Sequence, residues 1–372
     1  MTTAIPAEGR VDLRLSWDGD LILAATVRSR RPQPRRLLLG QPPEHAREVI
    51  PRLYSLCGDA QAVAVDALLG VLAPAGVRPS QPIAWAARIR LENIREHLWR
   101  LGLDWTRIAG LEPQPGPLRG LLAGREQFAN DDRSAREWAA QTYQSLFGMD
   151  GLPGPERLDM PALQHWLRAG GSSLAVLLRE LRPVLAGLGR SRAKAFASAD
   201  LPAFAVDALP RLRDDPDFHW CPDWAGEVFE MGPWARGRAL PLLAELEAEQ
   251  DGVDAWTRVV ARVLELAGEL EALAQGEPAR QAMAWHRQGD GAVVALEMAR
   301  GVLLHWIRLD AGRIGDYRIV APTEWNFHPR GPAQESFEQL QGADAQTLRD
   351  AVTRILMALD PCVHYELEIV HA

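Results

Sequence analysis

The clearest structural signal in this sequence is "EMARGVLLHWIRLDAGRIGDYRIVAPTEWN", at residues 297–326. Its apolar residues form the short runs "VLLHWIRL" and "DYRIVAP" around a turn at residues 310–312, and "AVVALEMA" precedes them. Short apolar runs bounded by turn residues are typical of β-strands. The stretch therefore predicts three strands, in which His305 and Trp306 serve as packing residues.

A second strand signal lies near the N-terminus. "VDLRLSW" and "LILAATVR" flank Asp18-Gly19-Asp20, and Asp-Gly supports the positive φ of a tight hairpin turn. Strands at both ends of a largely helical chain favour a fold in which the two ends meet. Such a fold would bring distant cysteines together.

Between these ends, apolar residues recur at helical spacing, whereas "QPGPLRGLLAGREQ", at residues 114–127, is loop-like by its glycine and proline. The predicted helices cover residues 43–72, 83–101, 132–147, 160–187, 236–274 and 344–358. We expect one predominantly helical α+β domain over residues 1–372. Its predicted parts are a hairpin at 1–30, a mainly helical region at 43–290, and strands, a helix and a cysteine segment at 291–372.

Composition narrows the class of protein. The chain has 372 residues, 47% of them apolar, and a net charge of -8, which argues against a nucleic-acid or anionic-membrane binder. The one concentrated basic stretch, "RSRRPQPRR" at residues 28–36, is predicted to be a solvated loop. No run of about 18 apolar residues and no signal peptide is found, so we expect a cytoplasmic protein without membrane insertion.

The three cysteines, Cys57, Cys221 and Cys362, contain no CxxC pair. They exclude a disulfide framework and a four-cysteine zinc site. Taken alone, Cys57 and Cys221 read as ordinary packing residues, and Cys362 followed by His364 is a weak metal signal. Any thiol chemistry must therefore be assembled by the fold.

Several ordered motifs resemble the large subunit of nickel-iron hydrogenases, and in particular its degenerate branch of HupK/HoxV-type maturation proteins. "AEGRVDLRL" at residues 7–15 resembles the N-terminal glutamate-glycine strand of that family, and "FEMGPWAR" at residues 229–236 resembles its Gly-Pro-x-Ala-Arg segment. Residues 297–326 resemble the stretch in which an Arg-Gly turn leads to His-Trp and then Pro-Thr-x-Trp-Asn. The resemblance implies a hydrogenase large-subunit-like helical core with small sheets near both termini.

The N-terminal cysteine motif departs from the family pattern. Hydrogenases have Arg-x-Cys-Gly-x-Cys-x-x-x-His, and this chain has "RLYSLCGDAQ" at residues 52–61. Tyr54 stands at the first cysteine, Cys57 at the second and Gln61 at the histidine.

The C-terminal motif departs in the same way. Hydrogenases have Asp-Pro-Cys-x-x-Cys-x-x-His, whereas here Cys362 is kept, Tyr365 replaces the second cysteine and Glu368 the histidine. One cysteine of each pair survives. The chain also ends four residues beyond Glu368, where hydrogenase precursors carry a removable extension, and this favours a protein that never receives nickel.

In the hydrogenase site, as the resemblance implies, four thiolates hold nickel, and two of them bridge to an iron that carries two cyanides and one carbon monoxide. A site with two cysteines supplies too few soft donors to retain nickel, but two thiolates suffice for an iron that brings three ligands of its own. The resemblance therefore implies that Cys57 and Cys362 transiently bind Fe(CN)2(CO), and no nickel is expected.

Other site residues follow from the resemblance. Arg300 matches an arginine that donates to a cyanide nitrogen, a role that suits a permanently charged guanidinium, although Ala299 replaces the proline before it. Tyr54 and Tyr365 are expected to fill the nickel side of the pocket or to touch the iron fragment, with His364 nearby. Glu8 matches a glutamate that is associated with proton movement.

These features predict a non-catalytic assembly scaffold of hydrogenase maturation. It would receive the fragment from the iron-fragment construction complex and pass it to the hydrogenase large-subunit precursor. Two alternatives remain open at this point: a divergent hydrogenase-like redox subunit, and a metal-free chaperone that mimics the large subunit.

Overall fold

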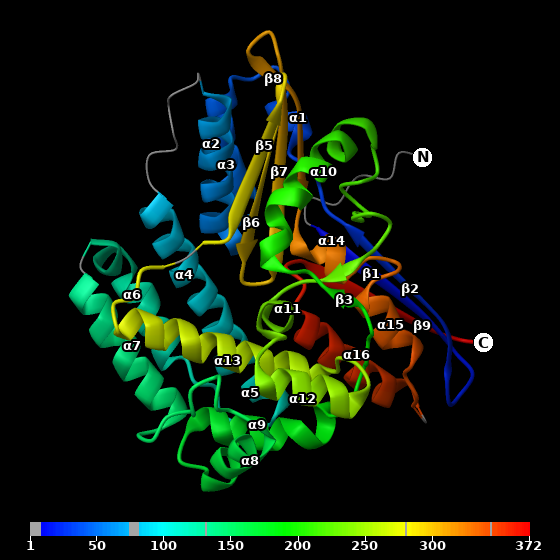
Figure 1. The fold of residues 1–372 in the computed structure, drawn as a ribbon. Coiled ribbons are helices and arrows are strands. Elements are labelled where there is room, and N and C mark those ends of the chain that lie inside the picture. The colour runs from blue at the N-terminus through cyan, green and yellow to red at the C-terminus, as the bar shows by residue number, and fades with distance from the viewer. Residues whose placement is uncertain (1–8, 74–81, 131, 280, 343) are drawn as a thin grey trace.

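The computed structural model describes residues 9–73, 82–130, 132–279, 281–342 and 344–372. Figure 1 shows that helices predominate among them and surround small sheets. The predicted α+β class, with a predominance of helix, is confirmed. Glu8 lies outside the described residues.

The α-helices follow one another along most of the chain. They are α1 (Arg35–Leu38), α2 (Ala46–Leu53), α3 (Gly58–Leu72), α4 (Pro82–Trp99), α5 (Thr106–Ile108), α6 (Gly116–Asn130), α7 (Asp132–Phe147), α8 (Met160–Ala169), α9 (Ser173–Leu185), α10 (Leu201–Asp214), α11 (Pro233–Gly237), α12 (Pro241–Gln250), α13 (Ala255–Ala274), α14 (Pro322–Asn326), α15 (Pro332–Glu338) and α16 (Ala345–Leu359). Short 3-10 turns precede α2, α3 and α10, at Pro43–His45, Ser55–Cys57 and Ser198–Asp200, and a π-helical turn, Arg100–Trp105, follows α4.

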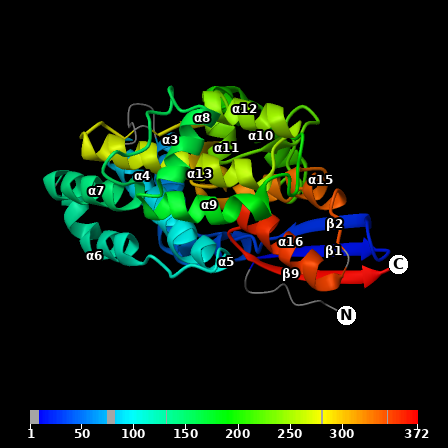
Figure 2. The same cartoon turned by 90° about the horizontal axis from the view of Figure 1, so that it is seen from below.

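The two ends of the chain meet in a three-stranded sheet of order β2-β1-β9. β1 (Arg10–Trp17) and β2 (Ile22–Arg30) form the predicted antiparallel hairpin, and β9 (His364–His371) pairs with β1 in parallel. Figure 2 shows these strands side by side, with α16 along them. The segment that carries Cys362 is therefore anchored to the N-terminal hairpin.

The second sheet is an antiparallel meander of order β5-β6-β7-β8. Its strands are Met283–Gln288, Gly291–Met298, Gly301–Asp310 and Arg313–Val320. In β7, Leu303 and Ile307 belong to the core on the α3 side, whereas Leu304 and Trp306 belong to the core on the α10 side. Burial on both faces explains why β6 and β7 read as nearly continuous apolar runs. A two-residue pair, β3 (Lys194–Ala195) with β4 (Phe229–Glu230), completes the sheets of the described residues.

The helical part of the protein is built around α13. Its side chains are buried on most sides, among α4, α7, α9, α11, α12 and α16, and Asp254 caps its first turn by accepting from the Thr257 N–H at 2.7 Å. The apolar stripe that the sequence indicates in this helix is therefore its core face. Of the described helices, the stretch Ser55–Leu72 alone is long and apolar enough to span a membrane, and half of it is buried inside the protein.

Three predicted helices match the structure closely, and three are divided. Residues 83–101, 132–147 and 344–358 correspond to α4, α7 and α16. The predicted helix at 43–72 contains α2 and α3, which the short turn Ser55–Cys57 separates. The predicted helix at 160–187 is two helices, because Gly170 adopts a positive φ of 62° after α8. The predicted helix at 236–274 is divided as well. Here α12 ends at Asp251, which has a φ of 49°, and α13 begins at Ala255.

The prediction of a loop at residues 114–127 is wrong. α6 begins at Gly116, so Pro117 falls in the first turn, where a missing N–H costs little. The strand β5 falls inside the region predicted as mainly helical, and α10 and β9 were not foreseen.

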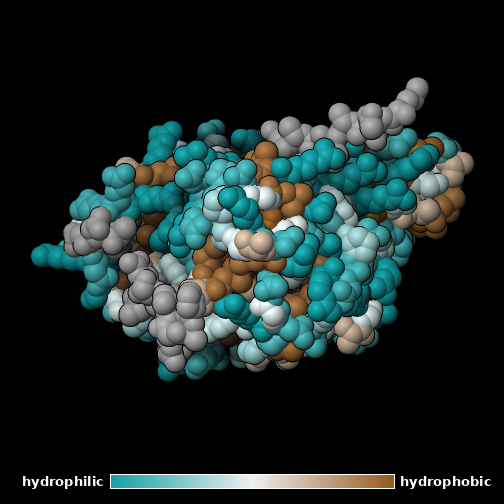
Figure 3. Space-filling view, turned by 90° about the horizontal axis from the view of Figure 1, so that it is seen from above, coloured by the Kyte–Doolittle hydropathy of each residue, from teal (hydrophilic) through white to brown (hydrophobic). Residues whose placement is uncertain are grey.

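Seen from above, the surface is mainly hydrophilic, with apolar residues gathered near the middle of that face (Figure 3).

Candidate metal-binding cleft

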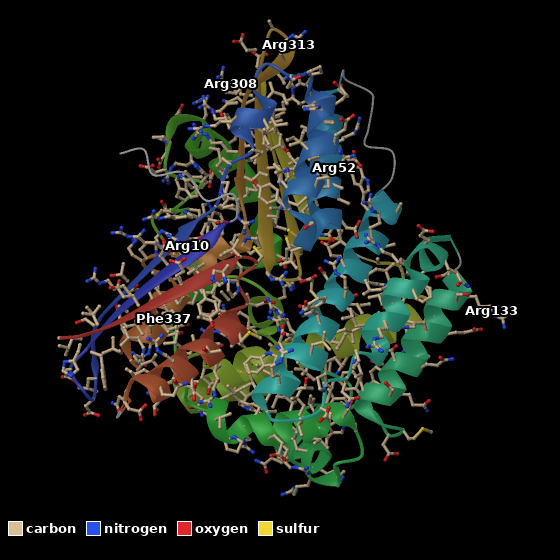
Figure 4. The ribbon with its side chains drawn as sticks, turned by 180° about the vertical axis from the view of Figure 1, so that it is seen from behind. Arg10, Arg52, Arg133, Arg308, Arg313 and Phe337 are labelled. Atoms are coloured by element: carbon tan, nitrogen blue, oxygen red, sulfur yellow. The ribbon has the colours of Figure 1, made fainter. Side chains whose placement is uncertain are left out.

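A cleft of about 610 Å³ lies where the hairpin, the end of α2 and the segment before β9 come together. Cys57 and Cys362 both line it, so the expectation that the fold brings these two cysteines together is confirmed. In Figure 4, Arg10 and Arg52 mark β1 and α2, and their chain neighbours Gly9 and Leu53 contribute to the cleft wall.

Cys57 occupies the position just before the first turn of α3. Its side chain is 3% exposed, and its N–H donates to the Tyr54 carbonyl at 3.1 Å, which closes the short 3-10 turn. Burial raises the pKa of the Cys57 thiol to about 12, with further contributions from the charges of Cys362 and Glu92. The thiol is thus held at a helix start, in surroundings that favour its protonated form.

Glu92 of α4 explains why the helix start does not activate Cys57. Its two carboxylate oxygens accept from the Asp59 N–H at 2.7 Å and the Ala60 N–H at 3.1 Å. The exposed N–H groups of a helix N-terminus would otherwise favour a thiolate. Burial, followed by the charge of Asp59, raises the pKa of Glu92 to about 7.

A chain of buried hydrogen bonds reaches the Cys57 sulfur. The Gln61 amide Nε2 lies 3.5 Å from Sγ, and its Oε1 lies 2.9 Å from His305 Nε2. The other ring nitrogen, His305 Nδ1, lies 2.8 Å from the Tyr317 hydroxyl. Because burial lowers the pKa of His305 to about 3, the ring is neutral, so Nε2 donates to Gln61 and Nδ1 accepts from Tyr317.

Cys362 is held on two sides. Arg31 Nη2 donates to its sulfur at 2.5 Å, and the Thr323 hydroxyl lies 3.0 Å from the same atom. The Cys362 N–H also points to the Thr323 oxygen, at 3.4 Å. Thr323 belongs to α14, so the Pro-Thr-x-Trp-Asn motif contacts the C-terminal cysteine directly.

Asp360 fixes the turn that precedes Cys362. It ends α16 in the left-handed region, with φ 58°, and its carboxylate is buried among three arginines. Arg100 Nε and Arg262 Nη1 donate to it at 2.7 and 2.9 Å, and Arg300 Nε lies 3.2 Å away. Despite burial, these positive charges hold the pKa of Asp360 far below its usual value.

Arg300 is buried beside this carboxylate and does not line the cleft. Its Nη2 donates to Glu96 at 2.7 Å, and its Nη1 has no hydrogen-bond partner among the described residues. Burial acts against the charge, but Asp360, Glu96 and Cys362 raise the pKa of Arg300 above its usual value. The cation therefore lies within electrostatic reach of Cys362.

The turn that carries Arg300 is well defined although Ala299 stands where the family has proline. Arg236 donates to the Met298 and Ala299 carbonyl oxygens, each at 3.0 Å, and to Glu265 at 2.7 and 2.8 Å. Gly301 follows with φ 133°. The arginine of the Gly-Pro-x-Ala-Arg segment thus helps to fix the turn before Arg300.

The other predicted site residues fall in different places. Tyr54 lines the cleft and donates to the Pro32 carbonyl at 2.7 Å, and His364 is exposed at the cleft wall. Tyr365 lies on β9 and packs against the core under the terminal sheet, so it is not among the described residues that line the cleft. Cys221 is exposed in a separate loop and does not line the cleft, so its interpretation as an ordinary packing residue is wrong.

The polar residues around the two sulfurs were not predicted from the sequence. The prediction of a solvated loop at residues 28–36 is wrong, because residues 28–30 end β2 and Arg35 and Arg36 begin α1. Arg31 is 4% exposed because it pairs with Glu324 at 3.3 Å. His305 is more than a packing residue, since it holds Gln61 against Cys57. The sequence contained a signal for this role, because the polar His305 falls on the same face of the strand as the apolar Leu303.

Comparison with known proteins agrees with these motifs. A family model described as nickel-dependent hydrogenase matches residues 253–365. The hydrogenase expression/formation protein HoxV of Cupriavidus necator is 31% identical, over 99% of this chain and 97% of the relative. The chain belongs to the HoxV/HupK family. The HupK protein of Rhizobium leguminosarum bv. viciae is 30% identical to this family member, over 99% and 98% of the two chains.

Solved structures support the fold of this HoxV/HupK family member. The Ni-Fe-Se hydrogenase of D. vulgaris Hildenborough, in its as-isolated oxidized state, superposes with a TM-score of 0.58 at 15% identity, over 93% of this chain and 94% of that one. The predicted hydrogenase large-subunit-like fold is confirmed. Across the residues that are described here, no three His, Cys, Asp or Glu side chains gather in a metal-ligating arrangement.

Proposed function

We propose that this chain is a non-catalytic assembly scaffold in nickel-iron hydrogenase maturation. In this proposal Cys57 and Cys362 transiently bind Fe(CN)2(CO), and the chain passes the fragment to the hydrogenase large-subunit precursor. The observation that carries the proposal is the placement of these two thiols, from opposite ends of the sequence, on one cleft. The relatives are hydrogenase expression/formation proteins by name, and this supports the maturation role.

The donor chemistry of the cleft fits such a cargo. Thiolates are soft ligands that suit low-spin iron, and an iron with two cyanides and one carbon monoxide needs few ligands from the protein. Gln61 and Arg31 each place an N–H donor at one of the sulfurs, which stabilises a bound thiolate. Tyrosines stand at the positions of the other two cysteines, so the cleft does not offer four thiolates to nickel. We therefore expect no bound nickel.

Arg300 and Tyr54 have supporting roles in the proposal. The free Nη1 of Arg300 offers a buried donor near Cys362, and Tyr54 occupies the wall beside Cys57. His364 is close enough to the cleft to contact a partner or the cargo. Tyr365 is not retained as a ligand-contacting residue because its side chain packs under the terminal sheet.

Transfer requires the donor and the acceptor protein to dock at the cleft in turn. Leu37, Leu53 and Leu56 line the cleft and are 54, 48 and 44% exposed. Exposed apolar side chains that gather around a cleft are typical of protein contact surfaces. We therefore propose that the iron-fragment construction complex and the large-subunit precursor both dock here, in the cytoplasm, and no nucleic acid or membrane insertion is part of the proposal.

The test is anaerobic purification of the full chain from a host with an active hydrogenase maturation system. Infrared spectroscopy and metal analysis should show cyanide and carbonyl bands with iron and without nickel. Cys57→Ala and Cys362→Ala should each lose the bands, whereas Cys221→Ala, the exposed cysteine away from the cleft, should keep them.

Other results point to other functions. Bound nickel, hydrogen uptake or a tightly attached iron-sulfur subunit would favour a divergent hydrogenase-like redox subunit. A wild-type chain that binds the large-subunit precursor but carries no iron and no diatomic bands would be a metal-free chaperone that mimics the large subunit.

A further inference from the structure

Arg31 contacts the Cys362 thiol in the cleft that both cysteines line. It follows β2 directly, lines the cleft together with Cys57 and Cys362, and is 4% exposed. Its bond to the Cys362 sulfur and its ion pair with Glu324 hold the guanidinium there, and an arginine stays protonated in proteins. A fixed positive charge therefore lies in the cleft that holds both proposed ligands of the iron.

The surroundings hold this guanidinium in one orientation. Its Nε lies 3.3 Å from Glu324 Oε1, and its carbon lies 5.6 Å from the centre of the Tyr54 ring. Glu324 is itself fixed, because it accepts from the Ala321 N–H at 2.8 Å and the Ser29 hydroxyl at 3.2 Å. The bonds to Cys362 and Glu324 use only part of the guanidinium's N–H donors.

Arg300, the other candidate cation, is placed differently. Glu96 and Asp360 both pair with it, and its side chain is not part of the cleft wall. Asp360 in turn binds two more arginines. The Arg300 guanidinium therefore links α4, through Glu96, to the turn before Cys362, through Asp360, outside the cleft wall.

We infer that Arg31 is the guanidinium that recognises the anionic cargo, and that Arg300 mainly positions the Cys362 segment. This inference rests on the proposed function. Cyanide ligands and thiolates both carry negative charge, and a forked, permanently charged donor suits several such acceptors at once. Tyr54, at one of the replaced cysteine positions, supports this assignment because its ring packs against the guanidinium.

The experiment compares variants of the full chain after anaerobic purification from the maturation-competent host. Arg31→Met removes the charge, Arg31→Lys keeps the charge but loses the fork, and Arg300→Met tests the rival cation. Arg36→Met is the matched control, because Arg36 lies on the same segment and is exposed. Since Arg31→Met leaves Glu324 buried and unpaired, an Arg31→Met/Glu324→Gln double variant keeps the test valid if the single variant is unstable.

The readouts are iron per chain and the positions of the cyanide and carbonyl bands. We expect Arg31→Met and the double variant to hold about tenfold less iron than wild type, as for a lost charge-assisted hydrogen bond. Arg31→Lys should keep part of the iron and shift the cyanide bands more than the carbonyl band, and Arg36→Met should equal wild type.

Unchanged iron and unchanged cyanide bands in folded Arg31→Met, with loss in Arg300→Met, would overturn the inference and assign the role to Arg300. This outcome differs from failure of the proposed function. In that case the wild-type chain itself carries no cyanide or carbonyl bands.

Discussion

The side-chain amide of Gln61 lies 3.5 Å from the Cys57 sulfur. The protein therefore has a nitrogen donor beside its N-terminal cysteine. His305 fixes the orientation of this amide through its Nε2 at 2.9 Å. The other ring nitrogen of His305 contacts the Tyr317 hydroxyl. Gln61, His305 and Tyr317 are all buried inside the protein.

His305→Phe should destabilise the protein because it removes the partner of both Gln61 and Tyr317 in a dry environment. We expect a loss of about 2 to 4 kcal/mol in the free energy of unfolding, measured by urea denaturation, and a smaller loss for Tyr317→Phe. His286→Phe, on the edge strand β5 of the same sheet and partly exposed, is the control and should change little. Equal stability of His305→Phe and wild type would show that the buried bonds contribute nothing.

The fold and the site were predictable from the sequence to different degrees. Asp18-Gly19-Asp20 indicates the hairpin because turn chemistry is local. The strand β9 also had a local signal, the alternation of Tyr365, Leu367 and Ile369, although it was overlooked. The burial of Arg31 had none, because it depends on Glu324, which lies 293 residues away in the sequence.

Glu92 should make stability depend on pH. Its folded pKa is raised to about 7 by burial and by Asp59, so the folded state binds a proton more tightly than the unfolded chain. Its contribution to stability is therefore full below pH about 4.5, the ordinary value of the group, and is lost as pH rises through 7. In wild type this loss amounts to at most about 3 kcal/mol.

Glu92→Gln removes this dependence. The difference in the free energy of unfolding between variant and wild type should shift in favour of the variant between pH 4.5 and 7, measured by urea denaturation at several pH values. A constant offset is expected as well, because an amide offers one acceptor where the carboxylate offers two to the N–H groups of α3. The exposed Glu48→Gln is the control. A difference that does not vary with pH would contradict the raised pKa.

Gly301 should tolerate no side chain. It has φ 133°, and a Cβ atom there would lie 2.5 Å from the Met231 Cβ and 3.2 Å from the Pro322 Cβ. Gly301→Ala should cost about 3 kcal/mol or more, because backbone strain and a clash with fixed atoms add. Gly312→Ala is a matched control: φ is also positive, at 76°, but open space surrounds the position, so only the strain of about 1 kcal/mol remains. Thermal unfolding should show a clearly larger loss of stability for Gly301→Ala than for Gly312→Ala. Equal losses would mean that the turn beside Arg300 can adjust to a side chain at position 301.

The leucines at the cleft should affect docking without affecting the fold. Leu37→Asp and Leu53→Asp place a carboxylate on side chains that are 54 and 48% exposed, so the free protein should remain as stable as wild type. If the large-subunit precursor docks here, its affinity for either variant should fall about tenfold, measured with both purified proteins by surface plasmon resonance. Leu122→Asp, on α6 and 50% exposed, is the control and should bind as wild type does. Unchanged affinity in the two cleft variants, together with measurable binding of the wild type, would place the docking surface elsewhere on the protein. A loss of affinity in all three variants would instead indicate that any added negative charge repels the precursor. A local contact at the cleft predicts a loss for the two cleft variants and none for Leu122→Asp.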